Sequence, residues 1–471
     1  MHIVARSLHD ILTATIAMST IQAELISSAL LDDRAAARCR AVLTALFGEP
    51  GQRTFDVRFW DGTVDRSANQ NPAYTLVLNR PAALRRMLMP PTELSIVESF
   101  IAGDVDIDGS MEAASRLGEQ IGGRLRSPLA IARLVQMLLR LPGQAEDDLA
   151  NTRFPEHARK LGQRHTPVRD AAAIQFHYDV GNDFYKLWLD RRMVYSCAYF
   201  ESPDGTLEDA QVAKLDLICR KLRLKPGERL LDIGCGWGGL IMHAAEHYGV
   251  DATGITLSEN QAAFARERIV KAGLSDRCRV DIRDYRTLNE SDGYDKIASV
   301  GMVEHVGLTH LPVYFASAYR ALKPGGLFMN HGIVSLGESR PRSVGERIFR
   351  KFWRADAFID KYVFPDGKLT ATYSVIAAAE GAGFEVRDVE SLREHYAMTL
   401  RRWVRSLEEK TEEATALVGD HTFRVWRLYM AASANAFSTA TINILQTVLA
   451  KPDARGRSNI PLTRDDLYAV R

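Results

Sequence analysis

The segment of the chain with the clearest chemical meaning is a glycine-rich run near its middle. Residues 230–239 read Leu-Leu-Asp-Ile-Gly-Cys-Gly-Trp-Gly-Gly, an apolar stretch followed by glycines at 234, 236 and 238. Glycine carries no Cβ, so the backbone can turn tightly after a strand and a ligand can approach it closely. The run predicts a binding loop of the nucleotide type, with glycines that serve only helix packing as the alternative.

Two details of the sequence narrow the choice of ligand for this loop. A dinucleotide-binding loop is followed, roughly 20 residues later, by an acid that holds the ribose hydroxyls, whereas Thr256 stands at that position here. Asp232, two residues before the first glycine, is typical of loops that bind S-adenosylmethionine. Asp284 and Tyr285 follow a later strand-like run, where an acid can meet the adenine amino group and a ring can lie beside its face. We expect S-adenosylmethionine as the cofactor, and a plain turn role for Asp284 stays open.

A sheet is needed to hold these segments together. Helical patterns separate five apolar, strand-like runs, and such alternation predicts a doubly wound, mostly parallel sheet. The expected fold class is therefore α/β and Rossmann-like. Lys323–Gly326 should form a tight turn before the last strand. The strand-like runs span residues 228–233, 251–257, 278–282, 294–300 and 327–333.

A smaller domain is expected in front of this sheet. The first fifty residues show helical periodicity, and alternating apolar residues follow, for example Phe55, Val57 and Phe59. These patterns predict a small α+β domain without an obvious constellation for chemistry, which favours a docking role. The predicted division is an N-terminal domain over 1–141, a polar and locally basic linker over 142–172, and a catalytic domain over 173–471.

The segment 128–141 at the end of the first domain combines many leucines with Arg133 and Arg140. Two interpretations are open: a helix buried between domains, or a helix at a membrane surface, where arginine beside leucine is favourable.

Composition restricts the class of protein. The chain has 471 residues, and 60 Lys and Arg against 59 Asp and Glu give a net charge of +1. This balance argues against a nucleic-acid partner. The five cysteines form no CxxC pair, so we expect neither disulfides nor a metal site, and a reducing cytosol instead. Because no signal-peptide pattern or long apolar run occurs, no membrane span is expected.

Several further motifs occur in a defined order along the chain. HYDVGNDFY (177–185) and YSCAYF (195–200) precede the glycine loop, and TLSENQ (256–261) follows it, with MVEHVG (302–307) further on. Taken together with His331-Gly-Ile and His395-Tyr-Ala-Met-Thr-Leu, they resemble the cyclopropane-fatty-acyl-phospholipid synthase family, which includes the mycolic acid methyltransferases. The resemblance covers roughly residues 170–405. The N-terminal half matches only the general plan of the family's smaller lead domain.

The resemblance implies methyl transfer to carbon. The π electrons of a cis double bond in a phospholipid acyl chain attack the sulfonium methyl, and loss of a proton from the new methyl closes a three-membered ring. Such a site needs apolar walls and aromatic rings that tolerate a cation. The candidate rings are Tyr178, Phe184, Tyr185, Tyr195, Phe200 and Tyr396.

By the same resemblance, the base is a bound bicarbonate ion rather than a side chain. The hydroxyl of bicarbonate can donate to a carboxylate while His and Tyr donate to its other oxygens. The implied catalytic residues are Cys197, Glu304, His331, Ile333 (through its backbone) and Tyr396. The residues expected to bind S-adenosylmethionine are Tyr195, Ser196, Asp232, Gly234, Cys235, Gly236, Gly238, Thr256, Ser258, Gln261, Asp284 and Tyr285.

Other outcomes stay open at this point. The same methyl transfer can end in a methylene or methyl-branched chain, and a small-molecule methyltransferase acting on oxygen or nitrogen is a different class. A silent lipid-binding protein is disfavoured, because the catalytic set is intact. Thr370 stands where the family usually has proline, in a segment expected to form a loop at the acyl channel.

The expected substrate also sets an expectation for location. An acyl chain in a leaflet must be reached from the water side, so we expect a cytoplasmic protein with transient, peripheral membrane contact. The first domain, the helix at 129–141 and the basic linker are the expected points of contact. Unsaturated phospholipid is the expected partner, and the resemblance implies a homodimer.

Overall fold

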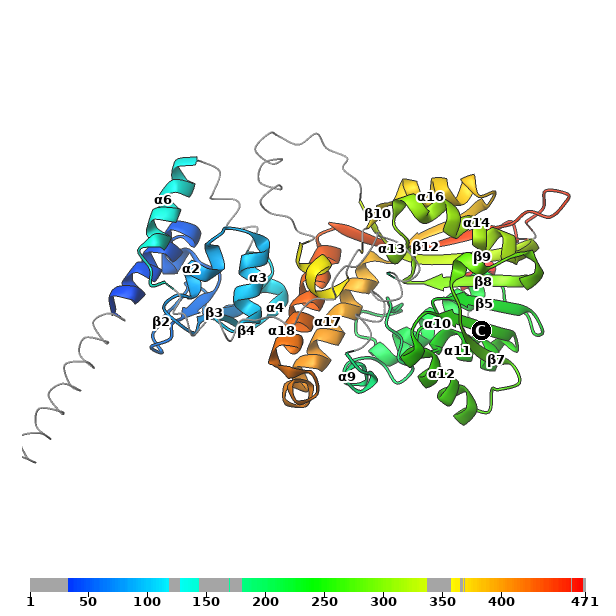
Figure 1. Ribbon diagram of the computed structural model, residues 1–471, viewed down its shortest axis with the longest axis horizontal. Helices are drawn as coiled ribbons and strands as arrows, with labels where there is room; N and C mark the ends of the chain where they lie inside the picture. The colour runs from blue at the N-terminus through cyan, green and yellow to red at the C-terminus, as the bar shows by residue number, and fades with distance from the viewer. Residues whose placement is uncertain are drawn as a thin grey trace, which may run out of the picture. The chain divides into compact units, whose positions relative to one another are not determined.

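The computed structural model describes residues 33–117, 128–143, 169, 180–336, 357–364, 367, 369–458 and 460–468. The chain divides into two compact units (Figure 1). Unit 1 comprises Met1–Phe154 and Ser343–Ala355, and unit 2 comprises Pro155–Arg342 and Asp356–Arg471. The expected linker lies almost entirely outside the described residues, so the predicted domain boundaries stay predictions.

Unit 1 is a small α+β unit built on a four-stranded sheet of order β2-β1-β3-β4. β1 and β3 run parallel, and the two other pairs are antiparallel. The alternating residues of the sequence fill its core, where Val57 and Leu76 are fully buried. The strands are β1 (Asp56–Arg58), β2 (Val64–Asp65), β3 (Tyr74–Leu78) and β4 (Val105–Gly109). The helices are α2 (Ala83–Leu88), α3 (Glu93–Ile101), α4 (Met111–Ala114), α6 (Pro128–Leu139) and a helix over residues 33–47.

Helix α6 buries only part of its apolar surface. Leu134 and Leu138 are buried, and the helix contacts α2. Leu129, however, is 83% exposed and Leu139 is 54% exposed. Within the described residues α6 therefore leaves part of its apolar surface exposed, and both interpretations of this segment stay predictions.

Unit 2 holds an eight-stranded sheet of order β11-β12-β9-β8-β5-β6-β7, with β10 beside β9. β9, β8, β5, β6 and β7 run parallel, whereas β12 is antiparallel to both of its neighbours. The predicted doubly wound α/β fold is confirmed. The strands are β5 (Arg229–Ile233), β6 (Asp251–Thr256), β7 (Cys278–Ile282), β8 (Tyr294–Val300), β9 (Leu322–Ser335), β10 (Thr370–Ala371), β11 (Glu385–Ser391) and β12 (Ile442–Ala450).

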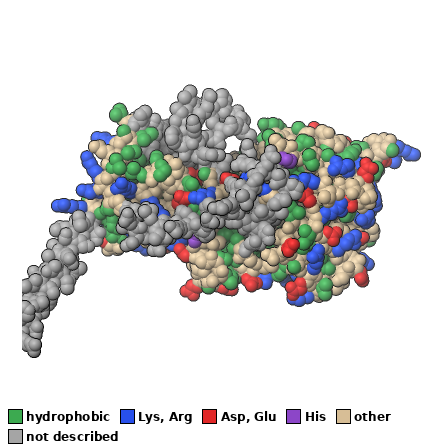
Figure 2. Space-filling view, viewed as in Figure 1, with side chains coloured by type: hydrophobic (Ala, Val, Ile, Leu, Met, Phe, Trp, Pro, Cys, Tyr) green, Lys and Arg blue, Asp and Glu red, His purple; other side chains and the backbone are tan. Residues whose placement is uncertain are grey.

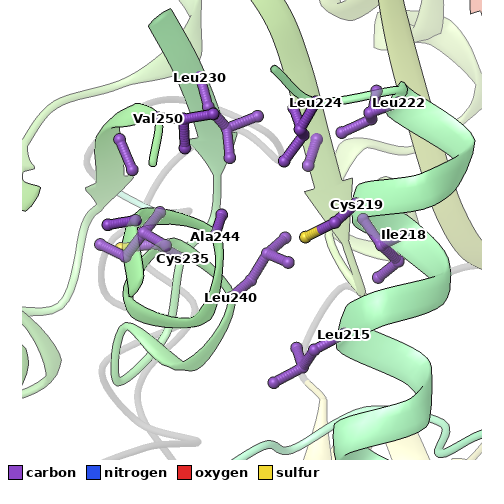
Figure 3. Packing of buried hydrophobic residues seen from close by; sticks show 14 of the residues in the cluster. Leu215, Ile218, Cys219, Leu222, Leu224, Leu230, Cys235, Leu240, Ala244 and Val250 are labelled. Atoms are coloured by element: carbon purple, nitrogen blue, oxygen red, sulfur yellow. The ribbon is translucent and has the colours of Figure 1, made fainter. Parts of the chain in front are cut away.

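Helices cover both faces of this sheet. Successive residues of a strand point to opposite faces, so Leu230 joins a core with α10 and α11, while Leu231 joins another with α14. Figure 3 shows the first core, with Cys219 among the leucines of α10. The helices are α9 (Asn182–Lys186), α10 (Leu207–Leu222), α11 (Gly239–Tyr248), α12 (Glu259–Lys271), α13 (Val303–Val306), α14 (Leu311–Ala321), α16 (Thr372–Gly381), α17 (Arg393–Glu409), α18 (Thr411–Ser438) and α19 (Asp465–Tyr468).

Two local predictions are wrong. β9 begins at Leu322, so Lys323–Gly326 lies within the strand instead of before it, although Gly325 has the φ of +79° that a tight bend requires. The pairing of β8 with β9 shifts register between Tyr294 and Lys296, which accommodates this segment. Thr370 does not lie in a loop, because it opens the short strand β10 and pairs with Val334.

Gly254 in β6 marks the tightest packing between the sheet and the glycine loop. A Cβ at this position would lie 2.6 Å from both Cβ and Sγ of Cys235. Gly254→Ala should destabilise the protein by about 1–3 kcal/mol, because neither strand nor loop can move freely. Urea unfolding measures the change. Gly381→Ala is the matched control, since its Cβ would meet nothing within 4 Å. Equal stability of the two variants would contradict this account.

Candidate active site

A cavity opens at the carboxyl ends of β5, β6 and β8, within unit 2. The free space in it and at its mouth, open solvent included, is about 1140 Å³. Carboxyl ends of parallel strands are where doubly wound sheets bind ligands. Nine of the twelve expected cofactor residues line it: Tyr195, Ser196, Asp232, Gly234, Cys235, Gly236, Thr256, Gln261 and Tyr285.

The glycine loop forms the floor of this cavity. The amides of Gly234 and Cys235 both donate to the carbonyl of Ile255, which fastens the loop to β6. Gly236 has a φ of +53°, and a Cβ built on it would meet nothing within 4 Å. Glycine is therefore needed there for its backbone conformation, and the space beside it stays open for a ligand. Gly238 instead packs closely on α12, as its Cβ would lie 3.2 Å from Cβ of Ala265.

The other three expected cofactor residues have identifiable structural roles. Gly238 is outside the lining, and Ser258 caps α12 by accepting from the amide of Gln261 at 3.3 Å. Asp284 is paired with Arg286, at 2.6 Å for one oxygen. Its contact with adenine stays a prediction.

Lys214 lies beneath the cavity and was missed by the sequence analysis. Its ammonium is buried and donates to Oγ of Ser196 at 2.8 Å. Burial lowers the pKa of Lys214 to about 8, and the carboxylates of Asp190 and Asp232 oppose that shift. The signal for this residue was available, because Ala210, Lys214 and Ile218 share one helix face at i, i+4 spacing. A lysine on an apolar face points to a buried charge with a partner.

Asp232 lines the cavity and has one carboxylate oxygen that can still accept a hydrogen bond. Burial raises its pKa to about 7, and Lys214 lowers it in part. Its Oδ1 is buried and has no hydrogen-bond partner among the described residues. A cationic group of a ligand would satisfy it, and S-adenosylmethionine carries an amino group and a sulfonium. Ser196 already accepts from Lys214, so its own hydroxyl hydrogen is free to be donated to the ligand carboxylate.

A second group of predicted residues gathers at the end of β9. Oε1 of Glu304 accepts from the amide of Ile333 at 2.7 Å. Oε2 of Glu304 is buried and meets no hydrogen-bond donor in the described part of the chain. Burial raises the pKa of Glu304 to about 7. The structure thus brings Glu304 and Ile333 together and leaves one carboxylate oxygen available to a ligand.

His331 presents a complementary atom. It is fully buried, and its Nδ1 faces the amide nitrogen of Gln446 at 3.1 Å. Burial keeps its pKa well below the usual value, so the ring is neutral. With an N–H of Gln446 donated to Nδ1, the ring proton lies on Nε2, which has no partner among residues that the structure describes. Gln446 was not predicted, since it lies on a neighbouring strand 115 positions away.

Cys197 and Tyr396 lie in apolar surroundings. Cys197 is fully buried, and its thiol contacts the carbonyls of Ala198 and Leu392. Burial raises its pKa, so the thiol stays protonated. The ring of Tyr396 lies 4.7 Å from that of Phe437. None of the five implied catalytic residues lines the cofactor cavity, and their predicted roles in binding bicarbonate stay predictions.

A cluster of aromatic rings adjoins the cavity. α17 and α18, inserted between β11 and β12, bring Trp403 and Trp426 against Tyr195, with ring centroids 5.3 and 6.1 Å apart. Tyr185 lies 4.9 Å from Trp237. The predicted rings Phe184, Tyr185 and Tyr195 belong to this cluster, whereas Phe200 instead holds Arg402, 4.2 Å above its face. Tyr178 lies outside the described residues.

The charge of Glu304 influences a tyrosine that packs against this aromatic cluster, Tyr429. Burial raises the pKa of Tyr429 to about 12, and the Glu304 carboxylate contributes to the rise. His305 lines the cavity next to Glu304, and burial lowers its pKa to about 4. The cavity therefore combines polar atoms at its base with aromatic walls.

The fold and this site define an S-adenosylmethionine-dependent methyltransferase. The family model described as mycolic acid cyclopropane synthetase matches residues 165–447, so the chain belongs to that family. Residues 42–116 match a domain of unknown function.

Known proteins resemble the chain over different lengths. A probable fatty acid methyltransferase of Pseudomonas putida is 40% identical over 415 residues, which is 88% of this chain and 95% of the relative. The cyclopropane synthase MmaA2 from Mycobacterium tuberculosis is 35% identical, with a TM-score of 0.55, over 59% of this chain and 97% of that chain. The cyclopropane synthase CmaA1, solved with SAH and CTAB, gives the same values.

Lys214 provides a test of the cofactor site. Lys214→Met removes the donor that orients Ser196, so affinity for S-adenosylmethionine should fall roughly 10-fold. Asp232 can take up a proton in this variant, which preserves folding. Titration calorimetry gives the affinity, and thermal unfolding checks the fold. Lys271→Met is the control, because that side chain is 73% exposed and pairs only with Glu267 among the ion pairs described here. Unchanged affinity in Lys214→Met would refute the role.

Proposed function

We propose that the protein is a cyclopropane-fatty-acyl-phospholipid synthase, which transfers a methyl group to a cis double bond in a phospholipid acyl chain. The observation that carries this proposal is the pair of buried, unsatisfied polar atoms, Oε2 of Glu304 and Nε2 of His331. A carboxylate or an imidazole can also serve as the base for methyl transfer to oxygen or nitrogen, so the names of the relatives favour carbon of an acyl chain. The similarity to fatty acid methyltransferases and cyclopropane synthases supports the lipid substrate.

The chemistry requires a methyl donor and a proton acceptor. S-adenosylmethionine supplies the methyl, the alkene π electrons form the new C–C bond as the C–S bond breaks, and proton loss from the new methyl closes the ring. The aromatic rings around Tyr195 exclude water and stabilise positive charge on the chain by cation–π attraction. Cys197 stays protonated in this setting, so it does not trap the cation as a nucleophile.

The two unpartnered polar atoms near the end of β9 support the proposal of a bound bicarbonate ion. Bound there, bicarbonate would accept the proton released in ring closure. Oε2 of Glu304 can accept from its hydroxyl, and Nε2–H of His331 can donate to an oxygen. Tyr396 completes the proposed set of ligands, together with Cys197 and the backbone of Ile333. Gln446 acts as a positioning residue, because it fixes which nitrogen of His331 carries the proton.

The proposal extends to location and partners. Among the described residues, no helix combines the length and apolar character needed to cross a bilayer. We propose a cytoplasmic protein that contacts the membrane surface transiently, has no nucleic-acid partner and forms a homodimer. Unsaturated phospholipid is the proposed substrate.

Lipid analysis of a bacterial host that lacks such an enzyme tests the proposed reaction. Expression should make monounsaturated acyl chains heavier by one CH2 group, and proton NMR should show ring CH2 signals. A methylene product has the same mass but shows vinylidene protons, and a methyl-branched chain carries two further hydrogens. Either result would overturn the ring assignment. Unchanged acyl chains, with methyl transfer to a small molecule, would overturn the lipid substrate.

Substitution of Glu304 tests the proposal that bicarbonate accepts the proton. Burial raises the pKa of Glu304 to about 7, so below that pH Oε2 carries a proton and donates, and only above it can Oε2 accept from the hydroxyl of bicarbonate. At constant bicarbonate ion concentration, turnover should rise as the pH increases through about 7. Glu304→Gln should lower kcat roughly 100-fold and remove both the pH step and the bicarbonate dependence. Glutamine can still accept from Ile333, so the backbone stays in place. Glu267→Gln, at an exposed position, is the control, and retained bicarbonate dependence in Glu304→Gln would contradict the assignment.

A further inference from the structure

Unit 1 contains a second cavity, whose lining residues belong to unit 1 alone. Its free space, including open solvent at its mouth, is about 770 Å³, and it is lined by Arg80, Arg85 and Arg86, together with Asp104. The remaining lining residues are Ala82, Met89 and Pro142. Three guanidinium groups and one carboxylate give this lining a formal charge of +2. The segment belongs to the part of the chain that matches a domain of unknown function.

The arginines are held in place by buried groups. Asp104 is fully buried, and its two oxygens pair with Arg80 at 2.9 Å and Arg86 at 2.8 Å. Arg85 donates to the carbonyl of Leu141, a neutral group, at 3.1 Å. Guanidinium groups fixed in this way lose little entropy when they bind an anion, and their planar donors match a phosphate. The lining therefore suits a phosphate group.

The cavity adjoins the exposed surface of α6. Leu141 and Pro142 follow that helix directly, and Arg38 donates to the carbonyl of Arg140 at 2.6 Å. Leu129, Ile131 and Leu139 are exposed, with Leu139 three residues before the cavity. In Figure 2, hydrophobic and basic side chains are intermixed over this part of the molecule.

We propose that this cavity binds the phosphate of an anionic phospholipid headgroup, while the exposed leucines of α6 enter the boundary between headgroups and acyl chains. Exposed leucine with arginine on one short helix is typical of interfacial binding. A free phosphate would suit the arginines but gives no reason for the exposed leucines. The proposal concerns binding alone, so it does not depend on the reaction proposed for unit 2.

Flotation of the full-length protein with lipid vesicles tests this site. The protein should bind vesicles that contain phosphatidylglycerol much better than vesicles of phosphatidylcholine alone. Arg85→Gln should weaken binding to the anionic vesicles roughly 5-fold, as expected for one basic residue at such a surface. Arg85→Lys should restore most of it. Leu139→Ser should also weaken binding, and thermal unfolding should show each variant folded.

Matched controls separate this site from general surface charge. Arg58→Gln removes the same charge from a half-exposed position of unit 1 that pairs with Asp108, and Leu308→Ser removes an exposed leucine from unit 2. Both should bind as the wild type does. Equal losses in Arg58→Gln and Arg85→Gln would overturn the proposal, as would absence of vesicle binding. If calorimetry shows binding of inorganic phosphate but the protein does not bind vesicles, the proposal of a phospholipid headgroup is overturned.

Turnover is tested apart from binding. Glu304→Gln should bind vesicles normally even if it is inactive, so failure of the proposed reaction leaves this result unaffected. Conversely, an active enzyme whose vesicle binding is insensitive to Arg85→Gln would overturn only the headgroup site.

Discussion

The end of β8 at Val300 is the constraint on which the active site depends. Val300 pairs with His331, and β9 continues to Ser335 without β8 beside it. A buried amide left without an acceptor costs about 1–3 kcal/mol. The Glu304 carboxylate takes the place of the missing strand by accepting from Ile333. β10 pairs with β9 from Val334 onward, so Glu304 accepts from the one amide between the two strands, at the polar end of the site.

The position of Glu304 depends in turn on the glycine between the two site residues of β9. A Cβ at Gly332 would lie 2.1 Å from Cγ1 of Val303, so only glycine lets α13 approach the strand. On the other side of β9, β12 places Gln446 opposite His331. Three consecutive residues of β9 therefore set the geometry of the site. Gln446 orients the imidazole of His331, Gly332 lets α13 approach, and the amide of Ile333 holds the Glu304 carboxylate.

The sequence predicted the parts of this arrangement that lie close together along the chain. Strand patterns located β5 to β8 within a residue or two, since a buried parallel strand is a short apolar run. The glycine loop was visible because its conformation demands glycine. Gln446 and Trp426 could not be predicted in the same way, because their contacts depend on how β12 and α18 fold back onto the sheet. Lys214 was predictable from helical spacing, but its partner Ser196 was not.

Unsatisfied polar atoms link stability to ligand binding in this fold. Asp232, Glu304 and His331 each bury an atom with no partner in the described residues, and each such atom costs free energy in the absence of a ligand. A ligand that satisfies them recovers this free energy only in the folded state, so binding stabilises the protein. Replacing these groups with apolar residues would remove the cost and the binding together. The site is therefore an internal source of instability that the extensive cores on both sheet faces must offset.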